Sequence, residues 1–165
     1  MALTSRFEAD QLYQQALAAA QRDKLNDAIV KLSQAIQLAP NDAEFLAARG
    51  YFYLLDRDHE KALQDFDHAL RYNAYEGLAK FGKGMLAYRQ NDWQTAEQCF
   101  EQALWASKAE RPEYVYMLAL SLFRQGRISE AKYQMELARA GYQKLNDSPH
   151  VRYADQWLIE FERQA

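Results

Sequence analysis

Three histidines and one cysteine are the side chains of this chain that could bind a metal ion or act as nucleophiles. A zinc site needs several such groups at fixed spacing, and a nucleophilic thiol needs a base beside it. His59, His68 and His150 show no ligand spacing with Cys99, and no base can be placed next to the thiol. We expect His59 to be solvated at a helix start and Cys99 to be a buried, unreactive thiol. The sequence therefore predicts no catalytic residue, no metal site and no cofactor.

A cluster of carboxylates is the second group that could do chemistry. Its members are Asp56, Asp58, Glu60, Asp65 and Asp67. A calcium-binding loop requires a central glycine and a terminal glutamate, and this cluster has neither at the required spacing. We interpret it as the solvated face of a helix.

The composition limits the classes of partner and the number of domains that can be expected. The 165 residues carry 20 Lys and Arg against 23 Asp and Glu, a formal net charge of -3. Nucleic-acid binding needs a basic face, so no nucleic-acid partner is expected. Hydrophobic residues make up 49% and charged residues 26%, values typical of a folded globular chain. We expect one domain over residues 1–165 that needs no disulfide.

No targeting or membrane segment is recognisable. The amino-terminal residues lack a basic region followed by an apolar run, unlike a signal peptide. The most apolar stretch, residues 114–123, is about half of the roughly 20 residues that a membrane span requires. The sequence predicts a soluble, cytoplasmic protein with no membrane partner.

An internal repeat of 34 residues organises the chain. Small residues recur in three columns, and one large apolar column accompanies them. The small columns are Ala28, Ala62, Ala96 and Ala131; Ala35, Ala69, Ala103 and Ala138; and Ala16, Gly50, Gly84 and Ala119. The large column is Leu32, Phe66, Phe100 and Met135. Two helices approach to about 8–10 Å only where the contact point carries little side chain, so these columns predict close helix pairs.

Each repeat contains two apolar stretches with helical spacing, separated by a short polar break. Ser5, Asn41 and Asn73 each stand three residues before a glutamate, which predicts capping at three helix starts. Ser148, before a proline, is expected to cap a last helix. Its apolar stripe of Ala154, Trp157, Leu158 and Phe161 is predicted to pack in the core.

These columns in a 34-residue helix–turn–helix unit resemble the tetratricopeptide repeat family. The units cover residues 9–42, 43–76, 77–110 and 112–145, with a capping helix at about 149–164. The match departs from the family at the inter-helix turn, whose usual glycine appears only as Gly126. The resemblance implies an all-α solenoid of nine helices, wound as a right-handed superhelix of paired helices.

The resemblance also implies a site, because such repeats bind partners on the concave face formed by the first helix of each pair. The columns facing this groove are aromatic or aliphatic, with two arginines at one edge. They hold Tyr13, Leu17, Tyr51, Leu55, Phe81, Met85, Arg89, Tyr116, Leu120 and Arg124. The two arginines could grip a carboxylate. The alternative is that these residues pack against neighbouring first helices.

We therefore expect a non-catalytic protein-interaction module that binds a peptide segment of a protein partner in an apolar, aromatic-lined groove. One alternative is a small cytoplasmic chaperone that shields an apolar segment of a secreted or assembling client. Another is a self-associating scaffold in which a second copy, as in a homodimer, covers the groove.

Overall fold

The computed structural model describes residues 2–107 and 110–164, with side chains from residue 5 onward. These residues form nine α-helices and no strand, as expected for an all-α solenoid of helix pairs. The helices are α1 (Ala2–Ala20), α2 (Leu25–Leu38), α3 (Ala43–Leu55), α4 (His59–Tyr72), α5 (Gly77–Arg89), α6 (Trp93–Ala106), α7 (Pro112–Arg124), α8 (Ile128–Lys144) and α9 (Ser148–Gln164).

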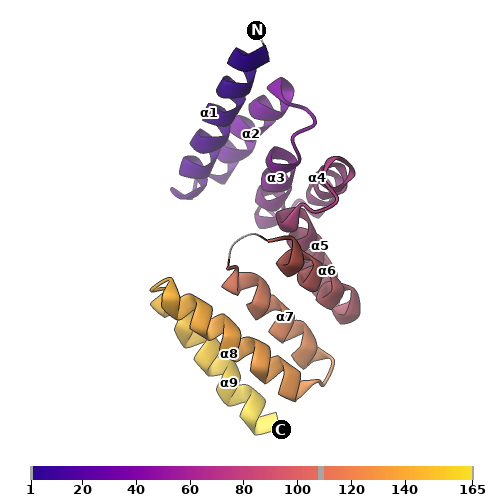
Figure 1. Cartoon of the computed structure of the whole chain (residues 1–165), viewed down its shortest axis with the longest axis vertical. Helices are drawn as coiled ribbons and strands as arrows, with labels where there is room; N and C mark the ends of the chain where they lie inside the picture. Colours follow the sequence, from indigo (N-terminus) through magenta and orange to yellow (C-terminus); the bar gives the residue numbers. More distant parts are fainter. Residues whose placement is uncertain (1, 108–109, 165) are drawn as a thin grey trace. The chain divides into compact units, whose positions relative to one another are not determined.

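The chain divides into two compact units, Met1–Gly82 and Lys83–Ala165, and the boundary falls inside α5. In the first unit α1 packs on α2, α2 on α3, and α3 on α4 (Figure 1). In the second unit α6 packs on α7, α7 on α8, and α8 on α9. Consecutive helices are therefore neighbours within each unit, while a single domain over residues 1–165 stays a prediction.

The small and large columns of the repeat meet inside the helix pairs α3–α4 and α5–α6. A Cβ added to Gly50 of α3 would lie 2.8 Å from a ring carbon of Phe66 on α4. A Cβ on Gly84 of α5 would lie 2.6 Å from the ring of Phe100 on α6. Both rings are fully buried, so the glycines of one column make room for the phenylalanines of the other.

The turns between paired helices share one backbone conformation, although only one of them contains glycine. Asp23, Arg57 and Asn91 have φ of 57°, 65° and 62°, and Gly126 has φ of 78° at the corresponding position. Asp and Asn tolerate this left-handed region better than most residues, whereas Arg57 does so at a cost. The turn geometry thus recurs in all four pairs, although three of them lack the glycine typical of the family.

The helix starts differ from those predicted by one to four residues. Asp42, and not Asn41, caps α3 by accepting a hydrogen bond from the Phe45 amide at 3.0 Å. Asn73 ends α4 instead of starting α5, and its side chain accepts a hydrogen bond from the Tyr75 amide.

The other two residues predicted as caps, Ser5 and Ser148, do not cap a helix start either. Ser5 lies inside α1, which begins at Ala2. Asp147 precedes α9 and accepts a hydrogen bond from the His150 amide at 3.3 Å, in the role expected of Ser148. Asp42 and Asp147 are each adjacent to another short polar side chain, so sequence spacing alone did not distinguish the cap from its neighbour.

Candidate interaction surfaces

In the first unit, the predicted groove residues come from α1, α3 and the start of α5. The half-buried ring of Tyr13 lies 5.1 Å from Phe45, and its hydroxyl donates a hydrogen bond to Glu44 at 3.0 Å. Burial, assisted by the Glu44 charge, raises the pKa of Tyr13. Tyr13 is therefore a neutral hydrogen-bond donor whose hydroxyl is already engaged by the neighbouring helix.

Tyr51 and Phe81 also meet in this unit, with ring centroids 6.4 Å apart. Tyr51 and Leu17 are half-buried, and Leu55 is 50% exposed. Phe81, however, is only 5% exposed. Its ring is part of the core and offers little accessible surface to a ligand, so its place in the groove stays a prediction.

In the second unit, Arg124 of α7 contacts two aromatic side chains that are not among the predicted groove residues. The Arg124 Nε lies 3.4 Å from the Tyr88 hydroxyl, and its guanidinium lies 5.7 Å from the centre of the Trp93 ring. Tyr88 and Trp93 make an edge-on contact with each other at 4.8 Å. Arg124 is exposed, and it forms no ion pair with a carboxylate among the described residues. The guanidinium is thus oriented while its charge stays uncompensated.

The same unit places Tyr116 of α7 opposite α9. Burial raises the pKa of Tyr116, and a hydrogen bond from Trp157 acts in the opposite direction. Tyr88 and Tyr153 act on that pKa in the same direction as burial, because a phenolate on either would repel that of Tyr116. Ring contacts through Tyr142 and His150 connect Tyr116 to Tyr153. We call the set Tyr88, Trp93, Tyr116, Arg124, Tyr153 and Trp157 the aromatic face.

The remaining predicted residues of this unit differ in accessibility. Met85 is half-buried and Arg89 is exposed. Leu120 is only 7% exposed, so it supports the helix packing and offers little surface to a ligand. Like Phe81, it lies on a helix that is covered on several sides, which a single helical period does not reveal.

Trp157 was expected in the core, and the structure gives it two roles. Its ring packs 5.7 Å from Phe123, yet the side chain remains partly accessible beside Tyr116. Tyr88 and Trp93 could have been found from the sequence, because they flank a predicted polar break next to the predicted Arg89.

The acidic cluster is only partly a solvated face. Asp65 is 4% exposed and accepts two hydrogen bonds of 2.7 Å from Arg49 of α3. Asp58 caps α4 through the Lys61 amide. Asp65 is therefore a structural anion, contrary to the expectation of a solvated side chain.

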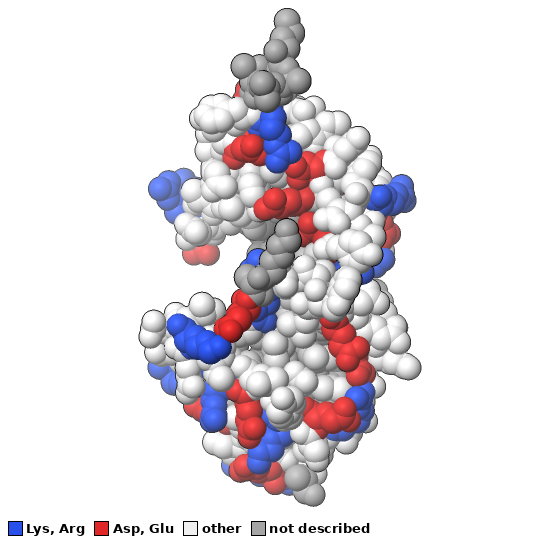
Figure 2. Space-filling model, in the orientation of Figure 1, with Lys and Arg blue, Asp and Glu red and all other residues white. Residues whose placement is uncertain are grey.

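The described residues contain no group of three or more His, Cys, Asp or Glu side chains that could hold a metal ion. Cys99 is partly accessible, where a buried thiol was expected. In the described part of the chain, no helix is long and apolar enough to cross a bilayer. Figure 2 shows acidic and basic side chains interspersed with wide uncharged areas on the visible face.

Comparison with known families identifies the class of protein. The tetratricopeptide repeat pattern matches residues 32–64 and residues 81–144, together more than half of the chain. The chain belongs to the tetratricopeptide repeat family, whose members are in general non-catalytic protein-interaction modules.

Two curated relatives carry similar segments. Human tetratricopeptide repeat protein 13 is 31% identical over 81 residues, which is 49% of this chain and 9% of that protein. The RNA polymerase-associated protein CTR9 of Caenorhabditis elegans is 30% identical over 92 residues, 50% of this chain and 8% of that protein. The chain thus spans less than a tenth of either relative.

Solved structures share the fold. Pseudomonas aeruginosa PilF superposes with a TM-score of 0.71 at 18% identity, covering 96% of this chain and 78% of that one. MamA of Desulfovibrio magneticus gives 0.63 at 18% identity, covering 94% and 96%. The Sgt2 domain of Aspergillus fumigatus gives 0.63 at 25% identity, covering 75% and 81%.

Proposed function

We propose that this protein is a non-catalytic interaction module that binds a peptide segment of a partner protein, with the aromatic face as the principal contact. The observation that carries the proposal is the position of Arg124, an exposed cation held by Tyr88 and Trp93 with no carboxylate partner among the described residues. A guanidinium ordered in this way loses little side-chain entropy when it binds a carboxylate.

The neighbouring rings supply the apolar part of the contact. Tyr116 and Trp157 offer rigid surfaces, each with one polar atom, that exclude water from a bound side chain. Tyr153 extends this surface and is 54% exposed. The favoured ligand is therefore a peptide with an apolar side chain for the rings and a carboxylate for Arg124.

Selection of peptides from a random library on the purified chain, followed by titration calorimetry, tests this proposal. Tyr116→Ala and Arg124→Ala should each weaken the selected peptide by about tenfold or more, as expected for contacts at the centre of an interface. Tyr133→Ala is the matched control, since Tyr133 is 60% exposed on α8 of the same unit but is not part of the aromatic face. Equal affinity in all three variants would show that the aromatic face does not bind the peptide.

The predicted groove residues of the first unit are tested separately. Tyr51→Ala removes an accessible ring, whereas Phe81→Ala would empty a core position and confuse binding with stability. The chaperone and self-association alternatives stay predictions. Solubilisation of an aggregating client on co-expression would favour the first, and a concentration-dependent mass in light scattering would favour the second.

A further inference from the structure

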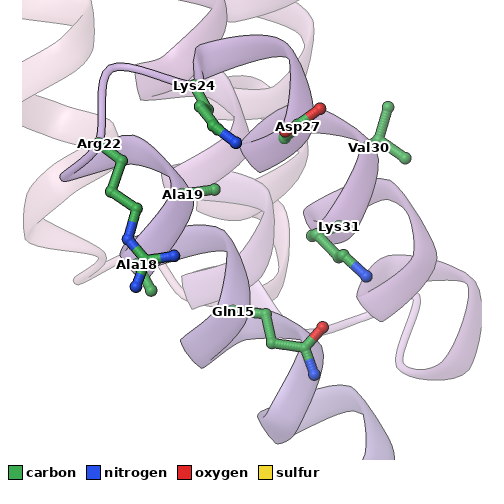
Figure 3. A pocket seen from close by; sticks show the side chains of 8 residues that line it. All are labelled: Gln15, Ala18, Ala19, Arg22, Lys24, Asp27, Val30 and Lys31. Carbon is green, nitrogen blue, oxygen red and sulfur yellow. The ribbon is translucent and has the colours of Figure 1, made fainter.

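A cleft in the first unit lies between α1 and α2, and its lining includes none of the residues predicted to bind a peptide. It is an open cleft with a volume of about 350 Å³. Figure 3 shows the side chains that line it, which come from the second half of α1, the turn and the first half of α2. They are Gln15, Ala18, Ala19, Arg22, Lys24, Asp27, Val30 and Lys31.

Charge is unevenly distributed in this α1–α2 cleft. Arg22, Lys24 and Lys31 supply three positive charges against the single carboxylate of Asp27. None of these three cations forms an ion pair within the described part of the chain. This local excess of two positive charges contrasts with the net charge of -3 of the whole sequence.

Three other cations of the first unit behave differently. Arg6, Arg49 and Lys61 each contact an aspartate at 2.5 to 2.7 Å. Three cations of the unit are therefore paired with carboxylates, whereas the three cations of the cleft have no such partner among the described residues. An anionic ligand would compensate the positive charges of the cleft.

Apolar atoms form the floor of the same cleft. Ala18 and Ala19 present only methyl groups, and Val30 is 55% exposed. A small inorganic anion would leave these atoms in water. A ligand with both carboxylates and apolar side chains would use the whole lining.

The spacing of the lysines indicates the shape of the ligand. Lys24 directly precedes α2 and Lys31 lies seven residues further along, which is about 10 Å at 1.5 Å per residue. Carboxylates at positions i and i+7 of a helix have the same separation. The alanines of the floor also allow a third helix to approach closely.

We propose that the α1–α2 cleft docks an acidic amphipathic helix of a partner protein. Acidic residues two turns apart contact Lys24 and Lys31, a further carboxylate contacts Arg22, and apolar residues between them cover Ala18, Ala19 and Val30. This second interaction site is independent of the aromatic face, so either can fail without the other.

Fluorescence anisotropy with a labelled peptide of about 20 residues tests the proposal. The peptide carries Glu at i and i+7, a third Glu on the same side for Arg22, and Leu at i+3 and i+4, and a scrambled peptide of the same composition is the reference ligand. Arg22→Ala/Lys31→Ala should weaken the patterned peptide by about tenfold or more, and binding should fall as salt is raised. Val30→Asp should weaken it as well, because it places a carboxylate on the apolar floor.

The matched control is Arg57→Gly/Arg71→Ala, which removes two exposed cations of the same unit that lie outside the cleft. Glycine accepts the positive φ at position 57 without strain. This control should bind the patterned peptide like the unmodified protein.

Three results would overturn the proposal. The first is equal affinity for the scrambled and patterned peptides, or no saturable binding of either. The second is displacement of the peptide by an equal concentration of inorganic phosphate, which would show a simple anion site. The third is a dimer that the Arg22→Ala/Lys31→Ala variant dissociates, which would make a second copy of the chain the occupant.

Discussion

The ring of Phe66 on α4 lies so close to Gly82 on α5 that a Cβ added to Gly82 would overlap the ring atoms. Phe66 is fully buried, and the same ring meets Gly50 on α3. The phenylalanine is thus enclosed by two glycines from different repeats. Gly82 lies outside the small-residue columns found in the sequence, and its role appears only in the folded chain.

Gly82→Ala should therefore destabilise the protein. Overpacking costs about 1–3 kcal/mol and alanine returns about 1 kcal/mol of helix propensity, so the net loss is expected to reach about 2 kcal/mol at most. Urea denaturation followed by circular dichroism measures it. Adding Phe66→Leu should recover part of the loss, and purely additive effects of the two changes would contradict the contact.

Asp65→Asn should be far more costly than loss of an exposed ion pair. The change leaves Arg49, whose side chain is 21% exposed, without the carboxylate that accepts its two hydrogen bonds. Breaking a buried pair costs about 3–5 kcal/mol, and the partial exposure of Arg49 favours the lower end. Lys61→Gln, which breaks the exposed Asp58 pair, is the comparison in the same denaturation assay. Similar losses from both would show that Asp65 is not a structural anion.

The cap of α3 offers a direct comparison of neighbouring positions. Asp42→Ala should cost about 0.5–2 kcal/mol because the Phe45 amide loses its acceptor. The change also removes the ion pair with Arg6, an exposed side chain, which adds little. Asn41→Ala should be nearly neutral in thermal unfolding. A larger loss of stability in Asn41→Ala than in Asp42→Ala would show that Asn41 is the cap after all.

Acid sensitivity should depend in part on the cap of α6. Hydrogen bonds from the Thr95 side chain and amide hold the pKa of Asp92 below its usual range. A depressed pKa means that the cap stabilises fully above about pH 4, the ordinary pKa of aspartate, and that this contribution is lost as pH falls through the folded pKa. Asp92→Asn keeps an acceptor but does not titrate. Its melting temperature should match the unmodified protein at pH 7 and fall less between about pH 5 and pH 2; parallel curves would contradict this.

The last helix can be tested with two positions on opposite sides. Phe161 is fully buried and stacks on Phe123 with ring centroids 4.7 Å apart, whereas Ile159 is 53% exposed. Phe161→Ala should cost about 3–5 kcal/mol. Ile159→Ala should change the free energy of unfolding by much less. A small effect at Phe161 would mean that α9 is not an integral part of the second unit.

The period of 34 residues was enough to predict the helix pairs, because helix packing requires small residues at fixed contact points and these recur regardless of other side chains. The repeat columns that contain Gly50 and Phe66 could therefore be recognised from the sequence alone. The left-handed turns at Asp23, Arg57 and Asn91 were less visible, since backbone conformation there is imposed by the flanking helices and not by glycine.

Tertiary structure alone decided which of the predicted groove residues are accessible and which charges are paired. The helical period does not say which side of a helix its neighbours cover, so Phe81 and Leu120 could not be separated from Tyr51 and Tyr116. Asp65 reads as a surface carboxylate until α3 brings Arg49 to it across 16 residues of chain. Burial and ion pairing depend on groups distant in sequence, and the local pattern of residues does not contain that information.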